Sequence, residues 1–217
     1  MAQKLTTIYI VRHGETEWNV RRIIQGHSDS PLTKKGIAQA KALARRFKTL
    51  HFDAIFSSDL VRAKRTADII ALEKRLAVET TRVLREQFFG KYEGAKRDDY
   101  YSLFEKWNEM TDRKRHRFKI SEDVESNEEA VIRFITFLRE IAVAYSGKTV
   151  LVVSHGAIMR YFLIHLGHMT YDDMLAFDNR GLLKLESDGV DFFIKEIKGL
   201  RKIKSVYGKR RRSSDIR

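Results

Sequence analysis

Apolar and polar residues follow one another along the chain in blocks that predict strands and helices in turn. Short runs rich in β-branched and aromatic residues at 5–11, 52–56 and 149–153 predict buried strands. Segments with apolar residues at every third or fourth position follow these strands, and the clearest such helical stripe covers 126–145. Because strands and helices alternate, the pattern predicts an α/β fold: a three-layer α/β/α sandwich around a mostly parallel sheet.

Capping signals mark where the predicted helices begin. Thr33 is a good N-cap for one helix, and residues 126–129 form a capping box at the start of another. For the helix that runs to about Leu72, the candidate N-caps are the two serines and the aspartate at 57–59. Polar residues therefore stand between a strand and a helix at several places along the chain.

Two stretches depart from this alternation. Residues 182–185 and 190–197 flank an Asp-Gly turn, which predicts an antiparallel hairpin near the end of the sheet. The passage at about 88–125 loses clean periodicity, so we expect a partly helical cap insertion. Its aromatic residues are expected either to form a wall over a substrate or to pack as the core of the insertion; they are Tyr100, Tyr101, Phe104 and Trp107.

Composition narrows the classes of function. The chain has 217 residues, of which 43% are hydrophobic, and no interdomain linker, so residues 1–200 are expected to form a single domain. Cysteine is absent, which excludes disulfides, thiolate nucleophiles and cysteine-ligated metals. No apolar run approaches ~18 residues and no signal peptide is recognisable, so we expect a cytoplasmic protein that does not associate with membranes.

The charge is strongly basic but unevenly distributed. The formal net charge is +13, and residues 195–217 carry ten Lys or Arg against two Asp or Glu. We therefore expect residues 201–217 to be a flexible basic tail with weak, non-specific affinity for polyanions. Specific binding of RNA, DNA or anionic lipid through this tail is the alternative.

Three segments whose side chains could take part in chemistry lie just after predicted strands. They are Arg12-His13, residues 57–62 and His155-Gly156. The carboxyl ends of parallel strands meet at one edge of a sheet, and helix N-termini at that edge attract anions. Arg62 falls in the first turn of its helix, where the macrodipole disfavours a cation by a few tenths to ~1 kcal/mol. A bound phosphate would remove this conflict; an arginine turned out into solvent is the alternative.

A histidine beside arginines suits phosphoryl transfer. The charges of Arg12 and Arg62 would lower the pKa of His13 and keep its imidazole neutral and nucleophilic, while both guanidinium groups bind phosphate oxygens. Attack by His13 would form a phosphohistidine that water then hydrolyses. Among the loop carboxylates, Glu86 has the apolar surroundings that suit a proton donor to the leaving oxygen.

These segments resemble the histidine phosphatase superfamily, with its phosphoglycerate mutase-like fold, across about residues 5–198. The matching blocks are 12–19, 25–26, 29–36, 57–67, 84–94 and 154–156. The resemblance implies that His13 is the phosphorylated nucleophile and Glu86 the proton donor. It further implies a pocket for the phosphoryl group formed by Arg12, Asn19, Gln25, Gly26, Arg62, His155 and Gly156, with His155 also counted as catalytic.

The activity implied is a metal-independent, cofactor-free phosphomonoesterase for small phosphorylated metabolites. Val124 and Tyr92 stand where the family's phosphatases more often have glycine and tryptophan. Residues 88–94 nevertheless resemble the phosphatase branch. For the basic residues at 113–117 there are three alternatives: they imitate the paired arginines of mutases, they steer polyanionic substrates, or they form a solvated loop. Phosphoglycerate mutase-type transfer is therefore the alternative, and an anion-binding protein acting through the tail is a third; the sequence carries no signal for an oligomeric state.

Overall fold

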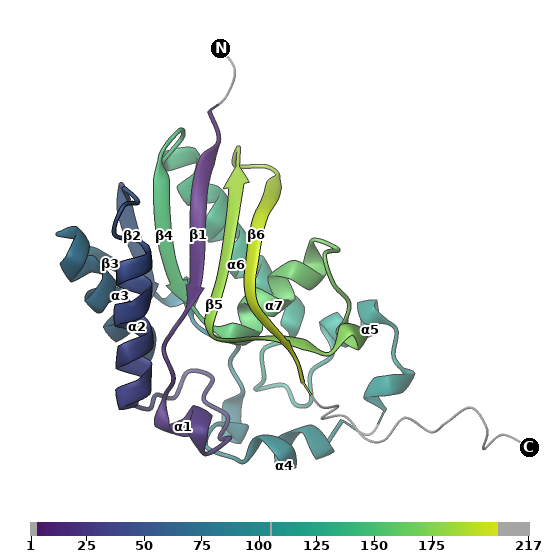
Figure 1. The fold of residues 1–217 in the computed structure, drawn as a ribbon. Helices are drawn as coiled ribbons and strands as arrows, with labels where there is room; N and C mark the ends of the chain where they lie inside the picture. The colour runs from purple at the N-terminus through teal and green to yellow at the C-terminus, as the bar shows by residue number, and fades with distance from the viewer. Residues whose placement is uncertain (1–3, 105, 204–217) are drawn as a thin grey trace, which may run out of the picture.

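The strand that ends at the predicted nucleophile, β1 (Thr6–Arg12), lies inside a six-stranded sheet in a computed structural model that describes residues 4–104 and 106–203 (Figure 1). The strand order is β3-β2-β4-β1-β5-β6. β1 pairs in parallel with β4 and antiparallel with β5. The other strands are β2 (Ala54–Ser58), β3 (Val78–Thr81), β4 (Thr149–Ser154), β5 (Leu175–Ser187) and β6 (Phe192–Lys202).

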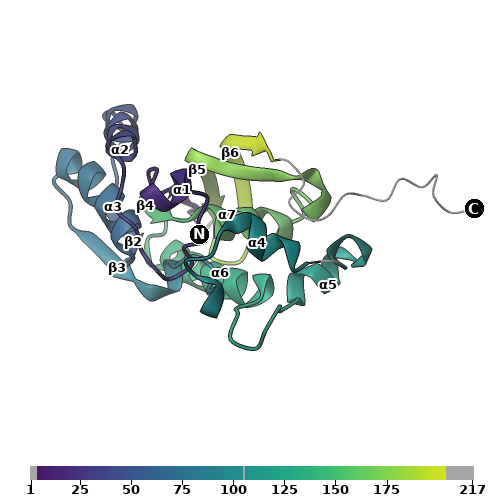
Figure 2. The same ribbon diagram turned by 90° about the horizontal axis from the view of Figure 1, so that it is seen from below.

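Helices cover both faces of this sheet, as Figure 2 shows. α2 (Lys34–Arg46) and α3 (Val61–Lys74) lie on one face, and α6 (Asn127–Ala144) and α7 (Gly156–His165) lie on the other. The predicted three-layer sandwich with a mostly parallel sheet is confirmed. In the described parts of the chain, no helix combines the length and apolar composition that crossing a membrane requires.

The two faces of β1 explain why its sequence is continuously apolar. Ile8 and Ile10 pack into the core under α6 and α7, whereas Tyr9 and Val11 pack into the core under α2 and α3. A strand that is covered on both faces has no solvent-facing position to fill with polar residues. Each fully buried side chain of this size contributes about 1.5–3 kcal/mol, so β1 is firmly anchored up to the point where the site begins.

The capping prediction holds at two helices and is wrong at the third. Thr33 and Ser126 cap α2 and α6, and the capping box of α6 is formed. The predicted caps at 57–59 do not begin α3, because its N-cap is Leu60, which has no side-chain cap bond. The carboxylate of Asp29, from a distant loop, accepts hydrogen bonds from the N–H groups of Val61 and Arg62 instead.

The hairpin is longer than the pattern predicts. β5 begins at Leu175, well before the expected residue 182, and Val190 lies in the turn, where the carboxylate of Asp188 accepts its N–H at 2.8 Å. Arg201 and Lys202, expected in the tail, belong to β6. The rest of the predicted basic tail, from residue 204, lies outside the described residues.

The predicted cap insertion contains short helical elements, and its buried aromatic residues join the core that lies under α6 and α7. Tyr100, Phe104 and Trp107 are buried together in it, while Tyr101 is half-buried and borders the main site. The core interpretation therefore holds for Tyr100, Phe104 and Trp107, whereas a wall over a substrate stays a prediction for Tyr101. The short elements of the chain are α1 (Glu17–Val20), η1 (Arg82–Leu84), η2 (Gly90–Tyr92), α4 (Arg97–Ser102), η3 (Trp107–Glu109), α5 (Asp112–Arg117) and η4 (Tyr171–Asp173).

Candidate active site

A cavity of about 570 Å³ lies where β1 and β4 end, between the cap, α7 and the start of β5. Most of the residues predicted from the sequence line it: Arg12, His13, Asn19, Gln25, Gly26, Arg62, Glu86 and Gly156. His155 does not line the cavity, but its ring centroid lies 5.2 Å from that of His13. The fold therefore brings the whole predicted set together.

His13 is held in one orientation at the end of β1. Its backbone N–H donates to the carbonyl of Ser154 at 3.0 Å, which extends the pairing of β1 with β4 by one residue. Its ring Nδ1 lies 2.7 Å from the carbonyl of Gly14. A carbonyl only accepts hydrogen bonds, so Nδ1 carries the proton and Nε2 keeps a free lone pair.

The pKa of His13 is lowered well below its ordinary value, first by burial and then by the charges of Arg62 and Arg12. The sequence predicts the effect of the two arginines. The larger cause, burial, follows only from the fold, because the ring is enclosed by segments far apart in the chain. The imidazole is therefore neutral at pH 7 and suited to act as a nucleophile.

His155 is fully buried beside His13 but is not fixed in the same way. Neither of its ring nitrogens has a hydrogen-bond partner within the described residues. Burial lowers its pKa well below the ordinary value, and the charge of Arg62 lowers it further. A neutral ring with both nitrogens free can donate one N–H to an oxygen held between the two histidines.

Arg12 reaches from the end of β1 across to β5. Its Nη1 donates to the carbonyl of Phe177 at 2.6 Å, whereas its Nε is buried without a partner in the described part of the chain. Burial, followed by the charge of Arg97, lowers its pKa to about 10, so the group stays cationic at pH 7. A Cβ on Gly156 would lie 2.8 Å from that Nε, so glycine at the start of α7 leaves room for the guanidinium.

Arg62 is only 1% exposed, so the alternative of an arginine turned into solvent is wrong. Its guanidinium donates to the carbonyls of Gly26 and Ser28 and to the carboxylate of Asp29 at 2.6–2.9 Å, which leaves Nε buried without a partner among the described residues. Asp29 also binds the first N–H groups of α3. Its negative charge therefore offsets both the helix dipole and the buried cation, a role that no local sequence pattern indicates.

Glu86 lies between the cavity and the first turn of α7. One carboxylate oxygen accepts the N–H of Ala157 at 3.0 Å, and the other accepts the N–H groups of Ile158 at 3.0 Å and Gln87 at 3.1 Å. Free amides at a helix N-terminus hold a carboxylate firmly. Glu86 is thus fixed at the wall of the site, against the N-terminus of α7, the helix that His155 precedes.

Two further residues hold parts of the site in place, and the sequence pattern did not identify either as a site residue. Glu93 accepts the N–H groups of His27 at 2.8 Å and Ser28 at 2.7 Å, and thereby shapes the loop that carries Gly26. Gly26 has φ +55°, and a Cβ there would lie 2.1 Å from the Glu93 carboxylate, so only glycine fits. Asn179 on β5 donates its side-chain N–H to the carbonyl of His13 at 3.2 Å. Glu93 falls in a matched block, whereas nothing in the local sequence marks Asn179.

The basic segment at 113–117 does not reach the site. It forms α5, where Arg115 pairs with Asp112 at 3.0 Å and Asp172 at 2.9 Å, and none of its residues lines the cavity. These residues therefore do not act inside the cavity as the paired arginines of mutases would, whereas steering of polyanions from a distance stays a prediction. The cations that line the cavity beyond the predicted set come from other elements; they are Arg22, Arg97, Arg160, Arg201 and Lys202.

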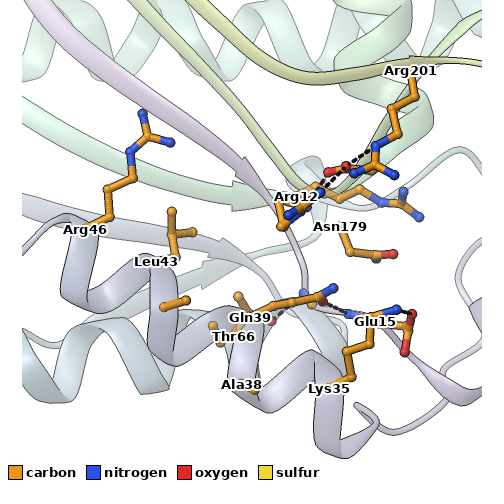
Figure 3. A pocket seen from close by; sticks show the side chains of 15 residues that line it. Arg12, Glu15, Lys35, Ala38, Gln39, Leu43, Arg46, Thr66, Asn179 and Arg201 are labelled. Atoms are coloured by element: carbon orange, nitrogen blue, oxygen red, sulfur yellow. Dashed lines mark hydrogen bonds and ion pairs between the residues drawn. The ribbon is translucent and has the colours of Figure 1, made fainter.

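A second, larger cavity of about 720 Å³ lies on the other side of Arg12, between α2 and β5 (Figure 3). Its charged groups largely satisfy one another: Lys35 pairs with Glu15 at 2.8 Å, and Arg201 pairs with Asp178 at 2.6 Å. Of the predicted site residues, only Arg12 borders it. The smaller cavity, and not the larger one, is therefore the candidate active site, because it is lined by most of the predicted site residues.

The chain is similar to known proteins along most of its length. A family model described as the histidine phosphatase superfamily (branch 1) matches residues 8–198. A probable phosphoglycerate mutase GpmB from Photorhabdus laumondii is 39% identical over 149 residues, which are 69% of either chain. The solved structure of Bacillus stearothermophilus YhfR is 27% identical with a TM-score of 0.78, covering 93% of this chain and 99% of that one. A phosphoserine phosphatase from Entamoeba histolytica, solved in complex with 3-phosphoglyceric acid, is 27% identical with a TM-score of 0.76, covering 88% of this chain and 96% of its own. The protein therefore belongs to the histidine phosphatase superfamily and has the phosphoglycerate mutase-like fold.

Proposed function

We propose that this protein is a phosphomonoesterase that hydrolyses small phosphorylated metabolites through a phosphohistidine on His13. The observation that carries the proposal is the set of polar atoms around the neutral ring of His13 that have no partner in the described part of the chain. They are Nε of Arg12, Nε of Arg62 and both ring nitrogens of His155. Buried polar groups without partners are costly, and the oxygens of a phosphoryl group would satisfy them together.

In the first step, Arg12, Arg62 and His155 hold the phosphoryl oxygens while Nε2 of His13 attacks phosphorus. The bond from phosphorus to the ester oxygen breaks as the new bond to nitrogen forms. Protonated Glu86 donates its proton to the departing oxygen, which leaves as the alcohol. The cationic side chains stabilise the charge on the phosphoryl oxygens in the transition state.

In the second step, water attacks phosphorus and the bond to Nε2 breaks. The carboxylate of Glu86, left ionised by the first step, accepts the proton of that water. His13 regains its neutral ring with the lone pair on Nε2, and inorganic phosphate departs. Because Gly14 holds Nδ1, the same nitrogen is presented in each cycle.

The test is turnover of an aryl phosphate by the wild type, His13→Ala and His51→Ala. His51 is a surface histidine remote from the cavity, so His51→Ala controls for a general effect of replacing a histidine. We expect full activity in His51→Ala and none in His13→Ala, and an acid-labile phosphorylated species in rapidly quenched wild type and His51→Ala but not in His13→Ala. Equal turnover by the wild type and His13→Ala would overturn the proposal.

The proposal assigns charge stabilisation to side chains, so turnover should persist in excess EDTA. Loss of activity in EDTA that an added metal restores would contradict it. The similarity to a probable phosphoglycerate mutase supports a second candidate, transfer of the phosphoryl group back to the substrate. Hydrolysis is favoured because the arginines at 113–117 lie away from the cavity. Isomerisation of 3-phosphoglycerate that outruns release of phosphate would establish the mutase instead.

A further inference from the structure

Three arginines in the described part of the chain are more than nine-tenths buried: Arg62, Arg115 and Arg160. Arg62 has the carboxylate of Asp29 at 2.9 Å, and Arg115 has two aspartates within 3.0 Å. Arg160 forms no ion pair with any described carboxylate. A buried cation without a counter-ion is unfavourable, so its surroundings require an explanation.

Arg115 and Arg160 have similar surroundings, so a comparison of the two shows which partner Arg160 lacks. Each guanidinium lies over an aromatic ring, at 5.9 Å for Trp107 and 5.6 Å for Tyr171. Each also donates to the backbone carbonyl of that aromatic residue. Arg160 differs in that its Nε is buried without a partner among the described residues and its side chain lines the cavity that holds His13. The missing anion therefore has a place to bind, on the cavity side of Arg160.

This place is separate from the phosphoryl pocket. Arg160 lies four residues after Gly156 on α7, which puts it about 6 Å further along the helix axis. Arg97, at the first position of α4, lines the same cavity, is half-buried and forms no ion pair within the described residues. After burial, its charge is the next strongest influence lowering the pKa of Arg12, so the two guanidinium groups are near each other.

The cavity also has apolar lining. Ile23, Ile24, Phe89 and Tyr101 line it together with these cations. A cavity with cations at the phosphoryl pocket and again at Arg160, and with apolar side chains in the same lining, suits a short molecule that is anionic at both ends. A phosphomonoester with a neutral remainder would leave Arg160 without a counter-ion.

We propose, on the basis of the hydrolase function above, that the substrate is a small phosphomonoester with a second anionic group, a carboxylate or a second phosphate, that binds Arg160. Arg97 adds positive charge on the same side. Arg160 is thus a specificity-determining residue that binds the part of the substrate that does not react. Arg160 should raise kcat/KM for substrates that carry the second anionic group and have little effect on kcat/KM for substrates that lack it.

The test compares 3-phosphoglycerate with glycerol 3-phosphate, which differ by a carboxylate in place of a hydroxymethyl group. Glycerol 1,3-bisphosphate is the third substrate, and its second anionic group is a phosphate. We expect wild-type kcat/KM to favour one or both of the substrates with a second anionic group over glycerol 3-phosphate by about tenfold to a hundredfold, as for a hydrogen bond to a charged group. Arg160→Gln should reduce this preference at least about tenfold, and Arg160→Lys should restore part of it.

Arg115→Gln is the matched control, because it alters an arginine of the same burial and stacking outside the cavity. It should change thermal stability and leave the substrate preference as in the wild type. A wild type that turns over all three substrates equally, or an Arg160→Gln variant that keeps the preference, would overturn the inference while the hydrolase function stands.

Binding keeps the two proposals distinguishable. If the wild type hydrolyses neither aryl phosphate nor these esters, the hydrolase function fails, and calorimetric titration of the same ligands decides the subsite. Tighter binding of the doubly anionic ligands by the wild type supports it, and equal binding of all three overturns it. If Arg160→Gln does not fold, the wild-type preference and the Arg160→Lys variant decide between these outcomes.

Discussion

Two His-Gly segments lie at the ends of neighbouring parallel strands, and their histidine rings are held differently. His13-Gly14 follows β1 and His155-Gly156 follows β4, with Arg12 paired to Ser154 in the ladder. Both rings are buried and have their pKa lowered well below the ordinary value, chiefly by burial. Of the two, only His13 has a ring nitrogen bound to a carbonyl of the described chain, that of Gly14.

The difference arises from the segment after each strand. After β1 the chain enters a loop whose backbone turns back to bind the histidine ring, which leaves one lone pair directed outward. After β4 the chain enters α7 at once, so its first turn serves Glu86 and the ring of His155 stays unbound within the described residues. Under the proposed function, the fixed ring of His13 presents one nitrogen as the nucleophile, whereas the unbound ring of His155 donates a hydrogen bond to a phosphoryl oxygen.

The largest expected effect separates the two rings by catalysis. His13→Gln should abolish turnover of an aryl phosphate, by a factor on the order of 10⁶, because no other group can form the covalent intermediate. His155→Gln should lower kcat by about 10²–10³, as for removal of one transition-state donor. Steady-state kinetics on both variants check this, and equal losses would show that the rings share one role.

The next effect tests Glu86, whose carboxylate is held by the first turn of the helix that follows His155. Glu86→Gln keeps the size of the side chain but removes the proton, so hydrolysis of an alkyl phosphate should fall about 10²–10⁴-fold. An aryl phosphate, whose leaving group needs little protonation, should be affected much less in the first step. A burst of phenol followed by slow turnover would report this, and equal losses with both esters would argue against Glu86 as the donor.

Both histidines should make the stability of the fold sensitive to acid, although their proposed roles in catalysis differ. Both pKa values are lower in the folded than in the unfolded state, so the unfolded chain binds more protons below about pH 6.5. The free energy of unfolding should therefore fall as pH drops through this range, by about 1.4 kcal/mol per pH unit for each histidine. Urea unfolding at pH 7.5, 6.0 and 5.0 measures it.

His13→Gln and His155→Gln should each flatten that pH dependence by a similar amount. A slope unchanged from the wild type in either variant would show that the ring is not held neutral in the folded state. The slope thus tests the shared property of the two segments, independently of turnover.

The smallest expected effect concerns the support of Arg62. Asp29→Asn keeps one acceptor for the start of α3 but removes the charge beside the buried guanidinium, so the protein should lose about 1–3 kcal/mol of stability. Asp68→Asn on the exposed face of α3 is the control, since its pairing with Lys64 is at the surface. Thermal melting compares the two, and equal melting temperatures would show that Asp29 does not stabilise Arg62.

The sequence by itself determined the order of strands and helices, the caps at Thr33 and Ser126, and the group of residues at the strand ends. These features depend on neighbours a few positions away or on periodicity, so the local pattern specifies them. The meeting of His13, Arg62 and His155 followed as well, because parallel strands bring their carboxyl ends to one edge. The part of Glu86 in the site followed from its apolar surroundings and from the resemblance to the family.

Only the tertiary structure decided which side chains complete the site. Asp29 caps α3 from 33 positions before Arg62, and Asn179 reaches His13 across 166 positions. Burial of the two rings, the displacement of α5 from the cavity and the missing counter-ion of Arg160 likewise arise from packing between distant segments. Such contacts depend on how whole elements lie against one another, and local sequence patterns carry no record of that arrangement.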